Sequence, residues 1–194
     1  MEMQTKQKHI KKQKFWKSKK FMPSLMGGFI IFIMVFSALG LWTGEDSQGA
    51  YEYKDIKFIQ TEYGWVGYKD GQKITLTTNP AELENITINY IPIYTLNPLS
   101  KVYLSLDYTE KALRAVQNFE QNIKITATTR PACTTDGPRC ANLPLKNCED
   151  ATDTTGVIIF KEDNQTKVTL INNCLTIQGE DPAKVVDKLI LTQL

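Results

Sequence analysis

Residues 102–122, VYLSLDYTEKALRAVQNFEQN, contain the two patterns that decide the fold. The first five residues place Val102, Leu104 and Leu106 at every second position, which is typical of a strand with one buried face. From Glu110 to Asn122 the apolar residues instead recur at helical spacing, with Asp107 or Thr109 available as the N-cap. The segment therefore predicts a strand followed at once by an amphipathic helix.

Shorter patterns on both sides extend this unit. Lys69-Asp70-Gly71 separates two apolar runs and predicts a β-hairpin with a type I′ turn, and Asp181-Pro182 predicts the start of a terminal helix. We also expect strands at 123–128 and 175–178, a hairpin pairing 157–160 with 167–171, and a bulge at Asn172-Asn173. Together these elements predict an α+β fold, with two helices covering one face of a mostly antiparallel β-sheet.

Residues 21–44 contain no charged side chain and are strongly apolar. As a helix rising about 1.5 Å per residue, they would cover roughly 36 Å, which is enough to cross a hydrocarbon core about 30 Å thick. We therefore predict one transmembrane helix here, with the lipid bilayer as its partner. A cleaved secretory signal is the alternative, since Ser37, Ala38 and Gly40 suit a cleavage site.

The charges around this apolar segment are asymmetric. Eight lysines lie in residues 1–20, whereas Glu45 and Asp46 follow the segment directly. The positive-inside rule places the N-terminus of such a single-pass cell-membrane protein in the cytoplasm. The predicted organisation is a basic cytoplasmic tail at 1–20, a transmembrane helix at 21–44, a membrane-proximal stalk at 45–60 and an extracytoplasmic α+β domain at 61–194.

The outer part of the chain is mildly acidic. Residues 43–194 hold 15 Lys and Arg against 20 Asp and Glu, a net charge of −5. This balance argues against nucleic acid as a partner.

All four cysteines follow the apolar segment, at Cys133, Cys140, Cys148 and Cys174. An even number in an oxidising compartment indicates two disulfides, and the spacing lacks the C-x-x-C pairs typical of zinc and thioredoxin-like sites. Three pairings are possible. We favour Cys133 with Cys140 and Cys148 with Cys174, because these pairs close a Pro/Gly loop and bracket the predicted hairpin.

The predicted outer domain has no histidine, because His9 is the only one in the chain. This removes the commonest general base and most zinc-hydrolase sites, so we expect no catalytic residue, no cofactor and no metal. An envelope hydrolase using carboxylates is the alternative function. Its candidate acids are Asp107 with Glu110 and the loop residues Glu149, Asp150 and Asp153; the loop acids lack the spacing of a calcium site.

Two triplets match the N-glycosylation motif, at Asn85 and Asn164. Aromatic residues also crowd the first part of the predicted domain, and Trp65 among them is a candidate for contact with glycans. Aromatic residues in strands are more often core, so we expect most of them to be buried.

The outer domain resembles a group of uncharacterised small single-span membrane proteins of reduced-genome (DPANN-type) archaea. The resemblance covers roughly residues 65–190 and rests on Lys69-Asp70-Gly71, Asn79-Pro80, the strand ending at Asp107, Ala132-Cys133, Asn147-Cys148, Asn173-Cys174, Ile177-Gln178-Gly179 and Asp187. It implies a tethered domain and brings no catalytic residue with it. We therefore expect a membrane-anchored extracytoplasmic binding or structural domain with a partner in a cell-envelope complex. A surface adhesive or ligand-binding module is a further alternative.

Overall fold

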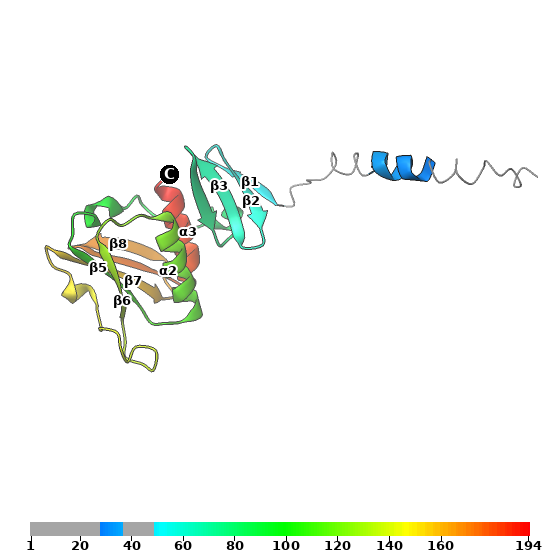
Figure 1. Cartoon of the computed structure of the whole chain (residues 1–194). Helices are drawn as coiled ribbons and strands as arrows, with labels where there is room; N and C mark the ends of the chain where they lie inside the picture. Colours follow the sequence, from blue (N-terminus) through cyan, green and yellow to red (C-terminus); the bar gives the residue numbers. More distant parts are fainter. Residues whose placement is uncertain (1–27, 37–48) are drawn as a thin grey trace, which may run out of the picture. The chain divides into compact units, whose positions relative to one another are not determined.

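The computed structural model describes residues 28–36 and 49–194, which belong to two separate units of the chain (Figure 1). In the first unit, residues 28–36 are helical and their side chains are exposed. Among the described residues, no helix has both the length and the apolar character needed to cross a membrane. Most of the predicted transmembrane segment at 21–44, and all of the basic tail at 1–20, lies outside the described residues.

The second unit begins with a four-stranded antiparallel sheet in chain order, formed by β1 (Ala50–Tyr53), β2 (Ile56–Thr61), β3 (Gly64–Lys69) and β4 (Gln72–Leu76). The predicted hairpin around Asp70 and Gly71 is confirmed as β3–β4, and both turn residues have the positive φ of a type I′ turn.

The predicted stalk at 45–60 is wrong over its described part, because β1 and most of β2 lie there. These strands meet at Lys54 and Asp55, whose φ angles of 45° and 67° also fit a type I′ turn. That turn contains neither Asn-Gly nor Asp-Gly, so it was not predicted from the sequence. Ile56 and Phe58 are buried at alternate positions, which is what fixes this strand to the domain.

The second sheet contains β5 (Lys101–Leu106), β6 (Thr128–Cys133), β7 (Thr155–Glu162), β8 (Lys167–Ile171) and β9 (Cys174–Gly179), in the order β6-β5-β7-β9-β8. Only β8 and β9 pair antiparallel. The expectation of a mostly antiparallel sheet is therefore wrong for this sheet, although the α+β class is confirmed.

Local hairpin signals caused this error. β7 does not pair with β8 but lies between β5 and β9, which are parallel to it. The tight turn is one strand later, where Asn172 and Asn173 have positive φ and join β8 to β9 in place of the predicted bulge. The predicted strand at 123–128 is wrong except at its last residue, because β6 begins at Thr128.

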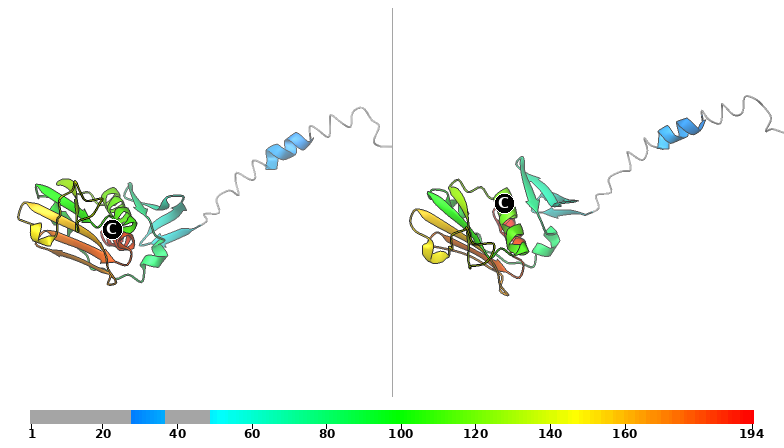
Figure 2. Two further views of the ribbon diagram at one scale, coloured as in Figure 1. Left: turned by 90° about the horizontal axis from the view of Figure 1, so that it is seen from below. Right: turned by 60° about the horizontal axis from the view of Figure 1, so that its bottom comes forward.

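Two helices, α2 (Glu110–Asn122) and α3 (Pro182–Thr192), lie side by side between the two sheets, as Figure 1 and Figure 2 show. Thr109 caps α2 and Asp181 caps α3, each by accepting a backbone N–H bond in the first turn. Short 3-10 turns, η2 (Pro80–Leu83), η3 (Ile93–Leu96) and η4 (Cys148–Asp150), complete the unit. One hydrophobic core joins both helices to both sheets.

Asp187 is the buried polar contact at the centre of these layers, with 0% of its surface exposed. Its carboxyl accepts the N–H of Thr77 at 3.1 Å, the N–H of Thr78 at 2.8 Å and the Thr77 hydroxyl at 2.8 Å. The Asn118 amide of α2 also donates to it. Burial raises the pKa of Asp187, while the bonds from Thr77 and Thr78 oppose that rise. One side chain thus connects α3, α2 and the end of β4.

Asn122 extends this connection along the outer edge of β4. Its amide group donates to the Thr75 carbonyl at 2.9 Å and accepts the Thr75 N–H at 2.8 Å, as a neighbouring strand would. The same amide also donates to Asn118 at 2.9 Å. Side chains from the helices therefore satisfy an edge that would otherwise expose unpaired backbone groups.

The other face of the five-stranded sheet is covered by residues 134–154, which connect β6 to β7. Ser105 of β5 donates to the Lys146 carbonyl at 2.6 Å, and Ala151 packs on Val157, Ile159 and Cys174. Disulfides pair the cysteines as Cys133–Cys140 and Cys148–Cys174, the pairing favoured by the sequence. The two disulfides hold the start and the end of this connection.

Replacing Asp187 with Ala should lower the free energy of unfolding by about 3 kcal/mol, because the Thr77, Thr78 and Asn118 donors lose a buried acceptor. Chemical denaturation of the folded chain measures this change. Asp181→Ala is the matched control, since it removes only a helix cap worth about 1 kcal/mol. Equal losses in the two variants would show that Asp187 does not join the layers.

Replacing Cys148 and Cys174 together with Ser should cost about 3 kcal/mol of stability, because their disulfide closes the longer loop of the denatured chain. The corresponding Cys133 and Cys140 double variant loses a disulfide that closes a shorter loop, and it should cost about 2 kcal/mol of stability. Urea unfolding with and without reductant gives both values. A wild-type protein that unfolds at the same urea concentration in both conditions would contradict the expectation.

Candidate functional site

The carboxyl ends of the parallel strands β5 and β6 bring together polar groups that are distant in sequence. Asp107 follows β5 and Thr134 follows β6. The Thr134 N–H donates to the Leu106 carbonyl at 3.2 Å, and the Thr134 hydroxyl lies 3.5 Å from an Asp107 carboxylate oxygen. Ligands of open α/β sheets bind at this end of the strands, so it is the first place to examine.

Tyr108, between β5 and α2, has a backbone conformation that bulky residues rarely adopt. Its φ of +51° lies in the left-handed region, which costs a residue with a Cβ roughly 1–2 kcal/mol. Arg139 donates from Nη1 to the Tyr108 carbonyl at 3.2 Å and so helps to hold it. Strained residues of this kind are found more often at functional sites than elsewhere.

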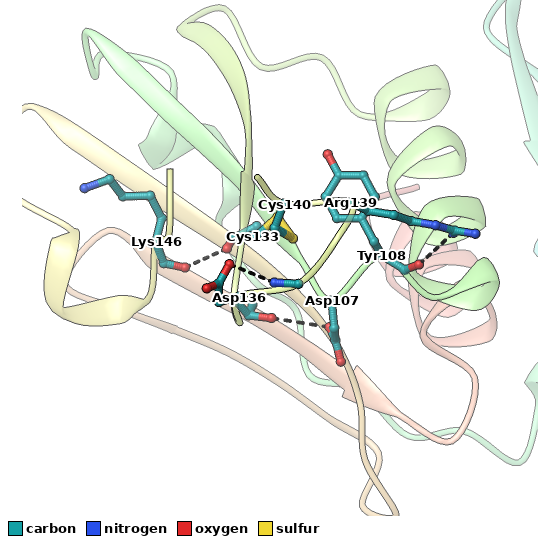
Figure 3. The surroundings of a disulfide bond; sticks show 10 residues. Asp107, Tyr108, Cys133, Asp136, Arg139, Cys140 and Lys146 are labelled. Carbon is teal, nitrogen blue, oxygen red and sulfur yellow. Dashed lines mark hydrogen bonds between the residues drawn. A yellow bond between two sulfur atoms is a disulfide. The ribbon is translucent and has the colours of Figure 1, made fainter. Parts of the chain in front are cut away.

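The Cys133–Cys140 disulfide closes a loop beside these residues (Figure 3). Within it, the Gly137 N–H donates to the Asp136 carboxylate at 2.8 Å and the Cys140 N–H donates to the Gly137 carbonyl at 2.9 Å. The loop and the end of β5 line an open cavity of about 240 Å³. Asp107, Tyr108, Asp136 and Arg139 all contribute to its lining.

The residues that line this cavity include two acids, an arginine and a tyrosine. Carboxylates accept hydrogen bonds and Arg donates a rigid fork of them, so a molecule with both donors and acceptors would be matched. Glu110, the acid that the sequence pairs with Asp107, does not line the cavity. The carboxyl groups of the cavity are therefore those of Asp107 and Asp136, not the Asp107–Glu110 pair that the sequence suggested.

The loop acids serve the structure of the connection from β6 to β7. Asp150 forms a salt bridge with Lys146 at 2.8 Å and accepts the Asn147 N–H at 2.9 Å. The Lys146 hydrogen bond, followed by that from Asn147, lowers the pKa of Asp150, which makes it a poor proton donor near neutral pH. Among the described residues, Glu149, Asp150 and Asp153 belong to no group of three or more side chains able to hold a metal.

Both glycosylation candidates are exposed. Asn85 follows η2 and Asn164 lies between β7 and β8. Trp65, the candidate for glycan contact, is instead buried in the core with 7% of its surface exposed. In the four-stranded sheet and its turns, the exposed aromatic residues are Tyr63, between β2 and β3, and Tyr68 of β3.

Comparisons with known proteins leave the chain without an identified relative: no protein-family model, no curated protein and no solved structure matches it. The site must therefore be judged on its own geometry. Among the residues of this site, the sequence analysis singled out Asp107 and the cysteines but assigned no role to Tyr108 or Arg139. Arg139 could have been noticed inside the short cysteine loop, whereas no sequence signal marks the φ of Tyr108.

The strain at Tyr108 predicts an unusual order of stability for two variants. Tyr108→Ala and Tyr108→Gly lose the same ring, but only Gly adopts positive φ freely. The Gly variant should therefore be more stable than the Ala variant by about 1 kcal/mol, as measured by chemical denaturation. Greater stability of the Ala variant would show that Tyr108 is not held in the left-handed region.

Proposed function

We propose that this protein is a membrane-anchored extracytoplasmic domain that binds an envelope partner and contributes to a cell-envelope complex. The observation that carries this proposal is the helix at 28–36. Its eight large apolar side chains, at positions 29–36, are each 48–68% exposed. Apolar side chains exposed on all sides of a helix favour a lipid environment over water.

The predicted transmembrane helix at 21–44 would include these nine residues. In this proposal the basic tail at 1–20 is cytoplasmic and residues 49–194 lie outside the cell membrane. The two disulfides support the outer location, because oxidising compartments allow such bonds to persist. Asn85 and Asn164 are the proposed modification sites of this outer unit, and both are accessible.

A protein of this kind should remain with membranes after alkaline carbonate extraction, and deletion of 21–44 should release it.

Photo-crosslinking side chains placed at exposed positions of the outer unit in intact membranes should capture a protein partner. Protease added outside intact cells should digest the outer unit and spare a tag at the N-terminus.

Each assay can contradict one part of the proposal. Complete release of the full chain by carbonate would contradict the proposed membrane anchor. Digestion of the N-terminal tag would contradict the proposed orientation. Absence of any captured protein across several crosslinking positions would contradict the proposal of an envelope partner.

A second candidate function is a surface ligand-binding module that uses the cavity at the ends of β5 and β6. The strained Tyr108, held by Arg139 beside Asp107, is the observation that favours it. Here the protein would bind a small polar molecule.

A further inference from the structure

The four-stranded sheet has one buried face and one exposed face. On the buried face, alternate side chains join the core that the sheet shares with the helices: Ile56, Phe58, Trp65, Ile74 and Leu76. Successive residues of a strand point to opposite faces of a sheet, so the residues between them form the exposed face. The exposed face consists of Ala50, Glu52, Lys57, Ile59, Val66, Tyr68, Lys73 and Thr75.

An apolar strip crosses three strands of this exposed face. Ile59 of β2 pairs with Ala50 of β1 on one side and with Val66 of β3 on the other. Tyr68 lies two residues farther along β3, and Tyr63 lies in the turn between β2 and β3. Ile59, Tyr63 and Tyr68 are 47%, 84% and 65% exposed. Single exposed apolar residues are normal, whereas a contiguous group of them indicates an interaction surface.

Charge does not select the occupant of this surface. Residues 49–76 contain four basic and four acidic side chains. Lys57, Lys73 and Glu52 lie on the exposed face itself, and Glu62 precedes Tyr63 in the turn. None of these four forms a salt bridge with the described residues. Neither a strongly acidic nor a strongly basic partner is therefore favoured, whereas zwitterionic lipid headgroups present both signs of charge.

The place of the strip in the chain does select an occupant. The Gly49 carbonyl accepts the Gln60 N–H at 2.9 Å, so the chain joins the sheet at Gly49. The predicted transmembrane helix ends at residue 44, and the five residues from there to Gly49 span at most about 17 Å. The predicted stalk at 45–60 would have allowed about 55 Å. Because β1 and β2 replace most of that stalk, the chain length holds this sheet close to the predicted membrane surface.

The strip and Tyr63 lie where the chain enters the sheet. Ala50 is the first residue of β1, and neighbouring strands are about 5 Å apart, so the strip extends only about 10 Å from Ala50 to Val66. Thr61 and Gly64 pair at the same end of the sheet and place Tyr63 in the turn between them. Tyrosine favours the membrane–water interface, because its ring is apolar and its hydroxyl is polar.

We propose that the exposed face of the four-stranded sheet lies on the lipid surface of the membrane that holds the anchor. Ile59 and Val66 contact the boundary between headgroups and acyl chains, and Tyr63 and Tyr68 lie among the headgroups. This inference rests on the proposed function, because it needs the anchor at 21–44. It goes beyond that function, since the anchor fixes only the location of the protein, whereas a second contact with lipid also fixes its orientation.

The direct test places a benzophenone side chain at position 63 or 68 of the full chain, in nanodiscs of zwitterionic phosphatidylcholine. The matched control places it at Tyr94 of η3, which is 64% exposed and lies outside the four-stranded sheet. After illumination, mass spectrometry should find at least five times more phosphatidylcholine adduct at 63 and 68 than at 94. Equal yields at the three positions would overturn the inference.

A charge placed in the strip should weaken the contact with lipid. Ile59→Asp changes an exposed side chain and should lower the adduct yield at position 68 at least threefold, because a carboxylate disfavours the acyl boundary. Ile171→Asp, at a residue of β8 that is 64% exposed, should leave that yield unchanged. Equal yields in the two variants would contradict contact through the strip. The comparison of positions 63, 68 and 94 does not need either variant.

The same crosslinking in intact membranes separates this inference from the proposed function. Lipid adducts at 63 and 68 support it, whereas capture there of another protein or of a second copy, in place of lipid, overturns it. A chain that resists carbonate extraction but gives no lipid adduct at either position overturns only this inference. Release of the chain by carbonate counts against the proposed anchor, and therefore against both.

Discussion

The arrangement of residues 49–194 depends on one buried carboxylate. Asp187 projects from the last helix and accepts hydrogen bonds from Thr77 and Thr78 after β4 and from Asn118 of α2. The four-stranded sheet has no pairing with the five-stranded sheet, so these bonds, those of Asn122 with Thr75 and the shared core position one sheet against the other. Apolar packing is not directional, whereas a buried acceptor must meet its donors. The hydrogen bonds of Asp187 therefore define how the layers are oriented, which apolar burial alone does not.

A mainly parallel sheet must be covered on both faces, and the α-helices described in residues 49–194, α2 and α3, lie on one of them. The connection from β6 to β7 covers the other face without a helix of its own, apart from the short turn η4. Such a loop loses much conformational entropy when it orders, and the two disulfides reduce that cost by restricting the denatured chain. The cysteines therefore replace part of the packing that a crossover helix would provide.

Local patterns predicted most of the elements but not their partners. The strand at 102–106, the helix at 110–122, the β3–β4 hairpin and the start of α3 were all readable, since caps, turns and periodicity are local. The position of β7 between β5 and β9 was not, because parallel pairing depends on contacts distant in sequence and has no turn signature. The same limit applies to the site: Asp107 follows a strand that the sequence predicts, whereas the contact between Tyr108 and Arg139 joins residues 31 positions apart.

The outer edges of the two sheets are protected in different ways. At β4 the side chains of Asn122 and Asp187 occupy the outward backbone groups, so a further strand would have to displace buried contacts. Among the described residues, the outer edge of β6 pairs with the segment around Leu145 only at its Cys133 end. An edge strand left open is usually protected by charge, proline or a bulge. Pro131, which has no N–H to donate, and the charged Arg130 give β6 some of that protection over the rest of its length.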